Sequence, residues 1–284
     1  MVGFNSAGYG ISIIGDDAAT YLHSQLTQDV LSLQVGQSSR SLILEPNGHL
    51  VSACEVLRRS KDDFVIICDS DASDIVFDRL SKYLIRTKAK VVRLGLLDLM
   101  AVGDHNEEMT LGPSIFSTNL VWETSNPSIS RQLLGTQDFL ALRVLSNWPR
   151  FGLEYQAGSL PNLFGDLKSL VSFSKGCYTG QELVERVDSR GAAAPKVIFG
   201  VITDCESFEM GAELLAQGKV VGKVNSSVSR PEKMLSELLD RTELNSNVRG
   251  AKLGFVTLSR GISPSDVDEL LMNEIRYNVK LNDL

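Results

Sequence analysis

No apolar run in this 284-residue chain approaches the roughly 18 residues that a transmembrane helix needs. The first residues, MVGFNSAGYG, lack the basic and apolar regions of a secretory signal. Repeats and low-complexity tracts are absent as well. These absences argue against a membrane partner, and we expect a cytoplasmic protein.

Cysteine and histidine are scarce. The four cysteines stand at positions 54, 68, 177 and 205 without a C-x-x-C pair, and the three histidines at 23, 49 and 105 are scattered. This spacing indicates neither a zinc site nor a disulfide framework, and no Cys/His or Ser/His/Asp arrangement can be argued from it. Cys54 and Cys68 lie in strand-like apolar segments, so we expect both in the core.

Basic residues are outnumbered, with 28 Lys and Arg against 35 Asp and Glu and a net charge of −7. General nucleic-acid binding needs a strong basic footprint, so we expect no nucleic-acid partner. A local basic patch is still present in the sequence. It is either an anion site or a solvated helix face, and it comprises Lys175, Arg186, Arg190 and Lys196.

The first half of the chain alternates irregularly between strand and helix patterns. Asp16 or Asp17 can cap a helix with Ala18, Tyr21, Leu22 and Leu26 on one face, and Asp71 or Ser73 can cap a second. Pro46, Asn47 and Gly48 are typical of a hairpin turn. The expected strands are 9–14, 42–44, 50–57, 64–68, 91–94 and 97–102. Irregular alternation with hairpins favours an α+β fold.

The second half predicts shorter elements. Residues 105–119 are polar and read as a loop between subdomains, 139–145 fit helix or strand, and 155–172 predict a loop with a short helix. After a linker at 190–195, the pattern predicts a strand at 197–202, a hairpin at 214–224 with a turn near Gly218, a short helical insert from Pro231 and a strand at 251–258. Short strands separated by glycine are typical of a small β-barrel or sandwich.

The stretch KGCYTGQE, residues 175–182, combines a reactive residue with a setting that can activate it. Thr179 and Glu182 have the spacing of a capping box, which predicts a helix from Gly180. Cys177 then lies just outside a helix N-terminus with Lys175 nearby, and both features favour the thiolate. The alternative from the residues alone is a buried cysteine in a tight turn.

KGCYTGQE, with Val184, Arg186, Arg190 and Gly191 after it, resembles the signature of the folate-binding YgfZ proteins, which are related to the glycine cleavage T-protein, an aminomethyltransferase. The segment QLTQDV at 25–30 and the stretch FLALRVL at 139–145 also resemble that family. The resemblance implies ferredoxin-like subdomains around a central channel with a C-terminal small β-barrel. The expected division is a folate-binding body at 1–190, with a junction near 105–119, and a barrel at 195–284.

By the same resemblance, tetrahydrofolate or a related folate is the expected cofactor, with Cys177 as the functional thiol. Trp148, Arg150 and Phe151 suit a flat ligand with an anionic tail, although ordinary packing is the commoner fate of such aromatics. The expected cofactor contacts are Lys175, Tyr178, Gly180, Gln181, Glu182, Arg186, Phe139 and Arg150.

The resemblance implies a protein that supports assembly or repair of iron–sulfur clusters in client enzymes, with those clients or assembly proteins as partners. Two alternatives stay open: a folate-dependent aminomethyltransferase, and a folate-binding module without catalysis. T-proteins carry an aspartate after the first hairpin turn, whereas this chain has His49, Leu50, Val51 and Ser52 there. This departure weighs against the transferase.

Overall fold

The structure is a computed structural model, and it describes residues 3–104, 106–128, 134–189, 194–203, 205–229 and 252–267. Strand β1 (Gly3–Ile14) lies inside a seven-stranded antiparallel sheet. β1 pairs with two neighbouring strands, one on either side. In spatial order the strands are β2 (Ser38–Leu44), β3 (Leu50–Arg58), β4 (Asp63–Cys68), β1, β5 (Lys90–Ala101), β7 (Ser117–Thr124) and β6 (Thr110–Ser114). The α+β prediction is confirmed.

The chain divides into two units. The first comprises Met1–Leu134, Tyr155–Asn162 and Asp166–Ala192, and it holds this sheet with helices α1 (Ala18–Gln25), α2 (Ser73–Lys82) and α4 (Gln181–Ser189). The second comprises Gly135–Glu154, Leu163–Gly165 and Ala193–Leu284. The predicted linker at 190–195 falls largely outside the described residues, so the division into a 1–190 body and a 195–284 barrel stays a prediction.

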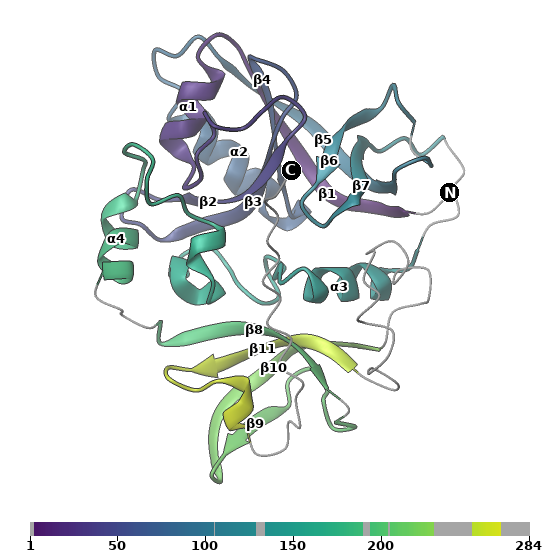
Figure 1. The fold of residues 1–284 in the computed structure, drawn as a ribbon, viewed down its shortest axis with the longest axis vertical. Coiled ribbons are helices and arrows are strands. Elements are labelled where there is room, and N and C mark those ends of the chain that lie inside the picture. The colour runs from purple at the N-terminus through teal and green to yellow at the C-terminus, as the bar shows by residue number, and fades with distance from the viewer. Residues whose placement is uncertain are drawn as a thin grey trace. The chain divides into compact units, whose positions relative to one another are not determined.

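Helices α1 and α2 pack against the sheet of the first unit, as Figure 1 shows beside β2, β3 and β4. The predicted apolar residues of α1 are all buried, and Asp17 occupies its N-cap position. The Asp17 carboxylate, however, accepts the amide of Lys88 rather than an amide of the helix. At α2 the predicted cap is wrong, because a 3-10 turn at Ser70–Ala72 leads in and Ala72 becomes the N-cap.

The predicted hairpin of β2 and β3 is confirmed. Gly48 has a φ of +85°, and its amide donates to the Glu45 carbonyl at 2.8 Å. The two strands predicted at 91–94 and 97–102 instead form the single strand β5. A register shift opposite Gly10 absorbs the break, and Gly95 there has a φ of +92°. A bulge of this kind lets one strand continue through a glycine.

Residues 110–114, expected in a loop, form β6, and β7 begins at Ser117. The sheet curls so that β6 and β7 cover one face of β3. A Cβ on Gly112 of β6 would stand 2.9 Å from Leu57 of β3. This close approach needs the glycine, which explains why a polar, glycine-containing segment forms a strand here.

Glu55 of β3 joins the curled parts of the sheet. Its Oε2 accepts the Trp122 indole N–H at 2.8 Å, and its Oε1 accepts the Ile115 amide at 3.0 Å. The side chain is 2% exposed, and burial raises the pKa of its carboxyl to about 7. Glu55 therefore connects strand β3 to β7 and to the turn between β6 and β7.

The second unit contains a four-stranded antiparallel sheet with the spatial order β8 (Lys196–Thr203), β11 (Lys252–Ser259), β10 (Lys219–Ser229) and β9 (Glu213–Ala216). The predicted hairpin turn is confirmed, with Gln217 and Gly218 at positive φ. Whether the sheet belongs to a barrel stays a prediction, and the insert predicted from Pro231 lies outside the described residues.

Helix α3 (Thr136–Leu145) contacts this sheet at β8, β10 and β11, so the ambiguous stretch 139–145 is helical. A Cβ on Gly200 would lie 3.1 Å from the Val144 carbonyl oxygen, which is why the helix can approach the sheet closely there. On the opposite side of the strands lies an apolar cluster of Val201, Phe208, Leu214, Val224, Val256, Leu258 and Val267. None of the helices within the described ranges has the length and apolar character of a membrane span.

Candidate functional site

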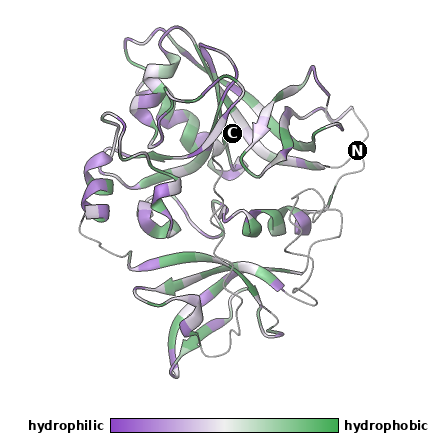
Figure 2. Cartoon of the chain, in the orientation of Figure 1, coloured by the Kyte–Doolittle hydropathy of each residue, from purple (hydrophilic) through white to green (hydrophobic). Residues whose placement is uncertain are grey.

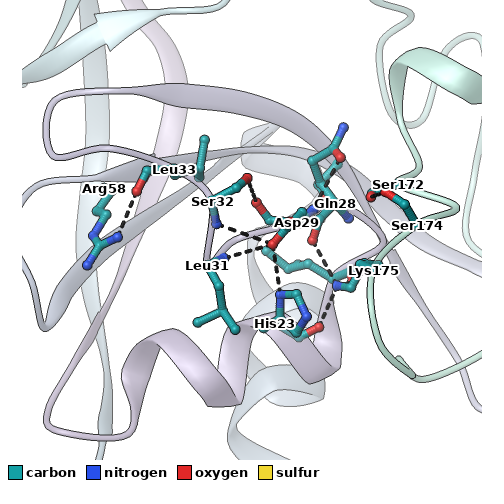
Figure 3. A network of polar contacts seen from close by, with 12 residues as sticks. His23, Gln28, Asp29, Leu31, Ser32, Leu33, Arg58, Ser172, Ser174 and Lys175 are labelled. Atoms are coloured by element: carbon teal, nitrogen blue, oxygen red, sulfur yellow. Dashed lines mark hydrogen bonds and ion pairs between the residues drawn. The ribbon is translucent and has the colours of Figure 1, made fainter.

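Lys175, the first residue of the KGCYTGQE motif, is bound to the end of helix α1. Its ammonium Nζ donates to the carbonyl oxygens of His23 at 2.5 Å, Leu26 at 2.7 Å and Gln28 at 2.8 Å (Figure 3). The last carbonyls of a helix lack partners within it and carry partial negative charge. Burial lowers the pKa of Lys175 to about 8, while the three acceptors favour the ammonium form. Lys175 therefore fixes the motif to α1.

Thr179 makes the second attachment. Its amide donates to the Ser24 carbonyl at 3.0 Å, and its hydroxyl lies 3.4 Å from both the Ser24 carbonyl oxygen and Gln25 Oε1. The capping box with Glu182 is therefore wrong, because the Thr179 hydroxyl is turned towards α1. Helix α4 begins one residue later than expected, and Gln181 Oε1 accepts the amide of Tyr178 at 3.2 Å instead.

Gly180 and Gly48 bring the motif against the β2–β3 hairpin. Gly180 has a φ of +83°, and a Cβ there would stand 2.7 Å from the Glu45 carbonyl oxygen. A Cβ on Gly48 would stand 2.3 Å from the Cβ of Leu183. Such distances leave no space for side chains, so Gly180 serves turn geometry and backbone packing.

A buried arginine links the same elements. Arg79 of α2 donates from Nη2 to the Leu44 carbonyl at 2.8 Å and from Nη1 to Gln25 Oε1 at 2.9 Å. Since Gln25 Oε1 also lies within reach of Thr179, α2, β2, α1 and the motif meet at one polar chain. The motif turn is thus supported by structure that is distant in sequence.

Cys177 lies between these two attachments and is exposed, whereas Cys54 and Cys68 are buried as predicted. Burial raises the pKa of the Cys54 and Cys68 thiols, which keeps them protonated. Among the described residues no group of three or more His, Cys, Asp or Glu could hold a metal ion. A thiol at position 177 is therefore accessible to a partner or a reagent.

His23 is a neighbour of the motif that sequence reasoning missed. A Cβ on Gly176 would stand 4.0 Å from His23 Nε2, and His23 Nδ1 lies 3.3 Å from Asp29 Oδ1. Asp29 Oδ1 in turn accepts the amides of Leu31 and Ser32 at 3.1 and 3.2 Å (Figure 3). Burial and then the Lys175 charge lower the pKa of His23, and Asp29 opposes them. His23 is recognised as part of the site only because the fold brings α1 next to Gly176 of the motif.

The first turn of α4 carries the exposed charges of the site. Glu182 pairs with Arg186, and Gln181 donates to Glu185. The Glu182 side chain is 86% exposed and that of Arg186 50%. Figure 2 shows α4 mostly in the hydrophilic colour. Tyr178, in contrast, is buried, with the Lys175 ammonium 5.2 Å from its ring centroid.

Phe139 and Arg150 lie in the second unit, on α3 and shortly after it. The Arg150 amide donates to Glu154 Oε2 at 2.6 Å, and the Phe139 ring centroid lies 5.7 Å from the Arg143 guanidinium carbon. Trp148 is buried. Their part in ligand binding stays a prediction. Arg190, of the predicted basic patch, lies outside the described residues.

Ser52 lies shortly after the turn of the β2–β3 hairpin, where the resemblance to T-proteins would place an aspartate. Its hydroxyl donates to the Ala53 carbonyl at 2.8 Å and lies 3.2 Å from the Tyr155 hydroxyl, which accepts the Ala53 amide at 3.0 Å. Ser52 and Tyr155 are both buried. This pair supplies hydroxyl groups and no negative charge.

No protein-family model matches the chain. An uncharacterized protein of Haemophilus influenzae is 27% identical over 231 residues, covering 77% of this chain and 81% of that protein. Proteins named tRNA-modifying protein YgfZ from Klebsiella pneumoniae and an Enterobacter species are each 27% identical, over 215 and 218 residues. These two matches cover 64% of this chain and 65% of the YgfZ proteins, so the matched part is just under two thirds of their length.

A solved structure has the same fold. The glycine cleavage system aminomethyltransferase T of Bartonella henselae matches with a TM-score of 0.69 and 16% identity, over 91% of this chain and 78% of that one. Identity at this level bears on the fold alone. The resemblance recognised in the sequence is therefore confirmed: the chain is similar in sequence to YgfZ proteins and has the fold of the glycine cleavage T-protein.

Proposed function

We propose that this protein binds tetrahydrofolate and supports the assembly or repair of iron–sulfur clusters in client enzymes, with Cys177 as its functional thiol. The observation that carries the proposal is the exposed Cys177 in a turn fixed on both sides, by Lys175 and by Thr179. Cys205 is partly exposed too, but it lies in the second unit beside Ser207 and outside the motif. The likeness to YgfZ proteins supports the same role.

The residues at the start of α4 fit part of a folate molecule. A carboxylate such as Glu182 accepts hydrogen bonds from the N–H edge of a pterin, and a guanidinium such as Arg186 pairs with the anionic glutamate tail. Both side chains are exposed, and since they pair with each other at the surface, a ligand would have to replace that pair. Lys175 and Gly180 are engaged in holding the turn, so their contribution to binding would be indirect. Gln181, Phe139 and Arg150 remain proposed contacts.

A cluster would be held only briefly. A lone motif cysteine cannot supply the four thiolates of a standard cluster, so any cluster contact would be shared with a client or assembly protein. An exposed thiol suits such sharing, because a partner's cysteines can approach it. We propose the cytoplasm as the location of this exchange.

Two alternatives are tested by the same experiments. An aminomethyltransferase needs a negative charge beside the substrate amine, and the buried Ser52 and Tyr155 pair does not provide one. A folate-binding module without catalysis would leave Cys177 without a role. The relatives are named tRNA-modifying proteins, and this agrees with the proposal if a client enzyme both carries a cluster and modifies tRNA.

The deciding experiment replaces Cys177 with Ser in cells that depend on this protein, with Cys205→Ser as the matched control. The proposal predicts that Cys177→Ser lowers the activity of iron–sulfur enzymes while the purified variant binds tetrahydrofolate like the parent. Full enzyme activity with Cys177→Ser would reject the functional thiol and favour the module. Release of a one-carbon unit from an aminomethyl substrate by either variant would favour the transferase.

A further inference from the structure

The segment from the end of α2 to the start of β5 differs in charge from the rest of the chain. Residues 79–97 hold six of the 28 basic residues and none of the 35 acidic ones, which leaves 22 basic against 35 acidic residues, or −13, elsewhere. Arg79 is buried, and Arg93 pairs with Asp74 at 2.9 Å. The other four cations are exposed and make no ion pair within the described residues: Lys82, Arg86, Lys88 and Lys90.

Exposed aliphatic side chains lie among these cations. Ile85, between Lys82 and Arg86 in the chain, is 74% exposed, more than any other large aliphatic side chain in the described ranges. Ile14 and Val92 are 43% and 42% exposed. Because Ile14 pairs with Lys90 in the sheet and Val92 follows Lys90 by two positions, these three side chains lie on one face of β1 and β5. The surface is therefore both basic and apolar.

The fold holds this segment in place. The Lys88 amide donates to Asp17 Oδ2 at 2.8 Å, which ties the end of the segment to the start of α1. At its beginning, the guanidinium carbon of Arg79 lies 4.0 Å from the ring centroid of Tyr83. The exposure of Ile85, between these two attachments, is thus a feature of the folded chain.

Carboxylates that adjoin the segment neutralise it only in part. Asp17 accepts the Lys88 amide, and Asp74 is paired with Arg93. Asp16 and Asp78 are exposed. The four exposed cations outnumber these two carboxylates, so the segment attracts anions although the chain as a whole repels them.

We propose that the segment 82–90, with Ile85 at its centre, docks on the surface of an anionic lipid bilayer. A Lys or Arg close to anionic headgroups raises the affinity about fivefold, and an aliphatic side chain enters the boundary between headgroups and acyl chains. The same headgroups repel the acidic remainder of the chain, which orients the protein with this segment towards the bilayer. Such a peripheral contact needs no apolar span, so it agrees with the absence of one in the sequence.

The aliphatic side chains favour a bilayer over other anionic partners. The phosphate backbone of a nucleic acid would engage the four cations but offers no apolar contact to Ile85. An acidic protein would need a pocket shaped for Ile85, whereas a bilayer accepts any exposed aliphatic side chain. A bilayer therefore uses both features of the segment.

The test is co-sedimentation of the purified full chain with vesicles of phosphatidylcholine and phosphatidylserine, compared with vesicles of phosphatidylcholine alone. The parent is expected to sediment with the anionic vesicles at low salt, to be released at high salt, and to stay in solution with the neutral vesicles. The double variant Lys88→Gln/Lys90→Gln should bind about 25-fold more weakly, fivefold for each charge. Ile85→Ser should weaken binding severalfold at unchanged charge.

Two control variants make the same chemical changes elsewhere. Lys219→Gln/Lys223→Gln removes two exposed charges from β10 of the second unit, and Val102→Ser removes a 55% exposed aliphatic side chain beyond the other end of β5. Both should bind like the parent, and circular dichroism confirms that every variant is folded.

Three outcomes would overturn the inference. The parent could fail to sediment with anionic vesicles, which would leave the segment to a nucleic acid or a protein, or it could sediment equally with both kinds of vesicle. An unchanged affinity of Ile85→Ser would also contradict it, because a surface that binds only through its charges takes anions in general. None of these measurements involves folate, Cys177 or an iron–sulfur enzyme, so the proposed function is judged separately.

Discussion

Nζ of Lys175 lies 2.7 Å from the carbonyl oxygen of Leu26, although 149 positions separate the two residues in the chain. This contact places the reactive stretch of the sequence on the end of the first helix. It also gives Lys175 a structural role, which is to hold the turn, beside the ligand contact that stays a prediction. The behaviour of Cys177 therefore depends on α1 as much as on its own neighbours.

Replacing Lys175 with Met should destabilise the first unit. The change keeps an apolar stem but leaves three carbonyl oxygens at the end of α1 without their donor, which costs roughly 2–4 kcal/mol. Urea unfolding measures the loss. Lys168→Met, at an exposed lysine of a nearby 3-10 turn, is the control and should change stability by less than about 0.5 kcal/mol. Equal effects of the two substitutions would show that the carbonyl bonds contribute nothing.

Replacing Gly180 with Ala separates backbone strain from crowding. Gly180 and Gly36 share a φ of +83°, so alanine costs about 1–2 kcal/mol of strain at either position. At Gly36 the added Cβ meets nothing within 4 Å, whereas at Gly180 it stands 2.7 Å from the Glu45 carbonyl oxygen. The stability loss should therefore be clearly larger for Gly180→Ala than for Gly36→Ala. Indistinguishable losses would contradict the close packing of the motif on the hairpin.

Glu55 should make the stability of the first unit depend on pH. Burial raises its folded pKa from 4.5 to about 7, so between these values the folded state binds more protons than the unfolded state. Stability therefore falls as pH rises from about 4.5 to 7, by roughly 3 kcal/mol, and is level above that range. Glu55→Gln cannot titrate.

The check is a set of urea unfolding curves between about pH 4.5 and 8 for the parent and Glu55→Gln. The difference in free energy of unfolding between the two proteins should shift across the window in the direction given above. A difference that is constant with pH would mean that Glu55 does not titrate there, and the inferred effect of its burial would be wrong.

Much of the fold was predictable because its signals are local. A continuous apolar run marks β4, the apolar face of α1 carries Ala18, Tyr21 and Leu22, and the Pro46 to Gly48 turn fixes the first hairpin. The errors arise where packing overrides local preference. Thr179 has the chemistry of a cap, but its amide and its hydroxyl both face the carbonyl of Ser24 on α1 instead of the amides of α4.

The candidate site was predictable only in part. The motif itself could be read from the residues, whereas the exposure of Cys177, the partners of Lys175 and the approach of His23 to Gly176 could not. Those contacts join segments about 150 positions apart, and no periodicity or spacing encodes them. Glu55 was missed for the same reason, because its partners come much later in the chain: Trp122 lies on β7, and Ile115 lies in the turn before it.

Glu182→Ala should weaken the binding of tetrahydrofolate with little loss of stability. Among the described residues the exposed Glu182 pairs with Arg186 on its own helix, and such pairs contribute about 0.3–0.5 kcal/mol. Asp188→Ala, an exposed carboxylate later on the same helix, is the control and should leave binding unchanged.

Calorimetric titration of the purified parent with tetrahydrofolate, repeated on Glu182→Ala and Asp188→Ala, tests the central claim most directly. The account predicts micromolar binding to the parent, about −8 kcal/mol, and a loss confined to Glu182→Ala. No detectable heat of binding with the folded parent would contradict the claim, and it would mean that this chain has the fold of the T-protein without its folate.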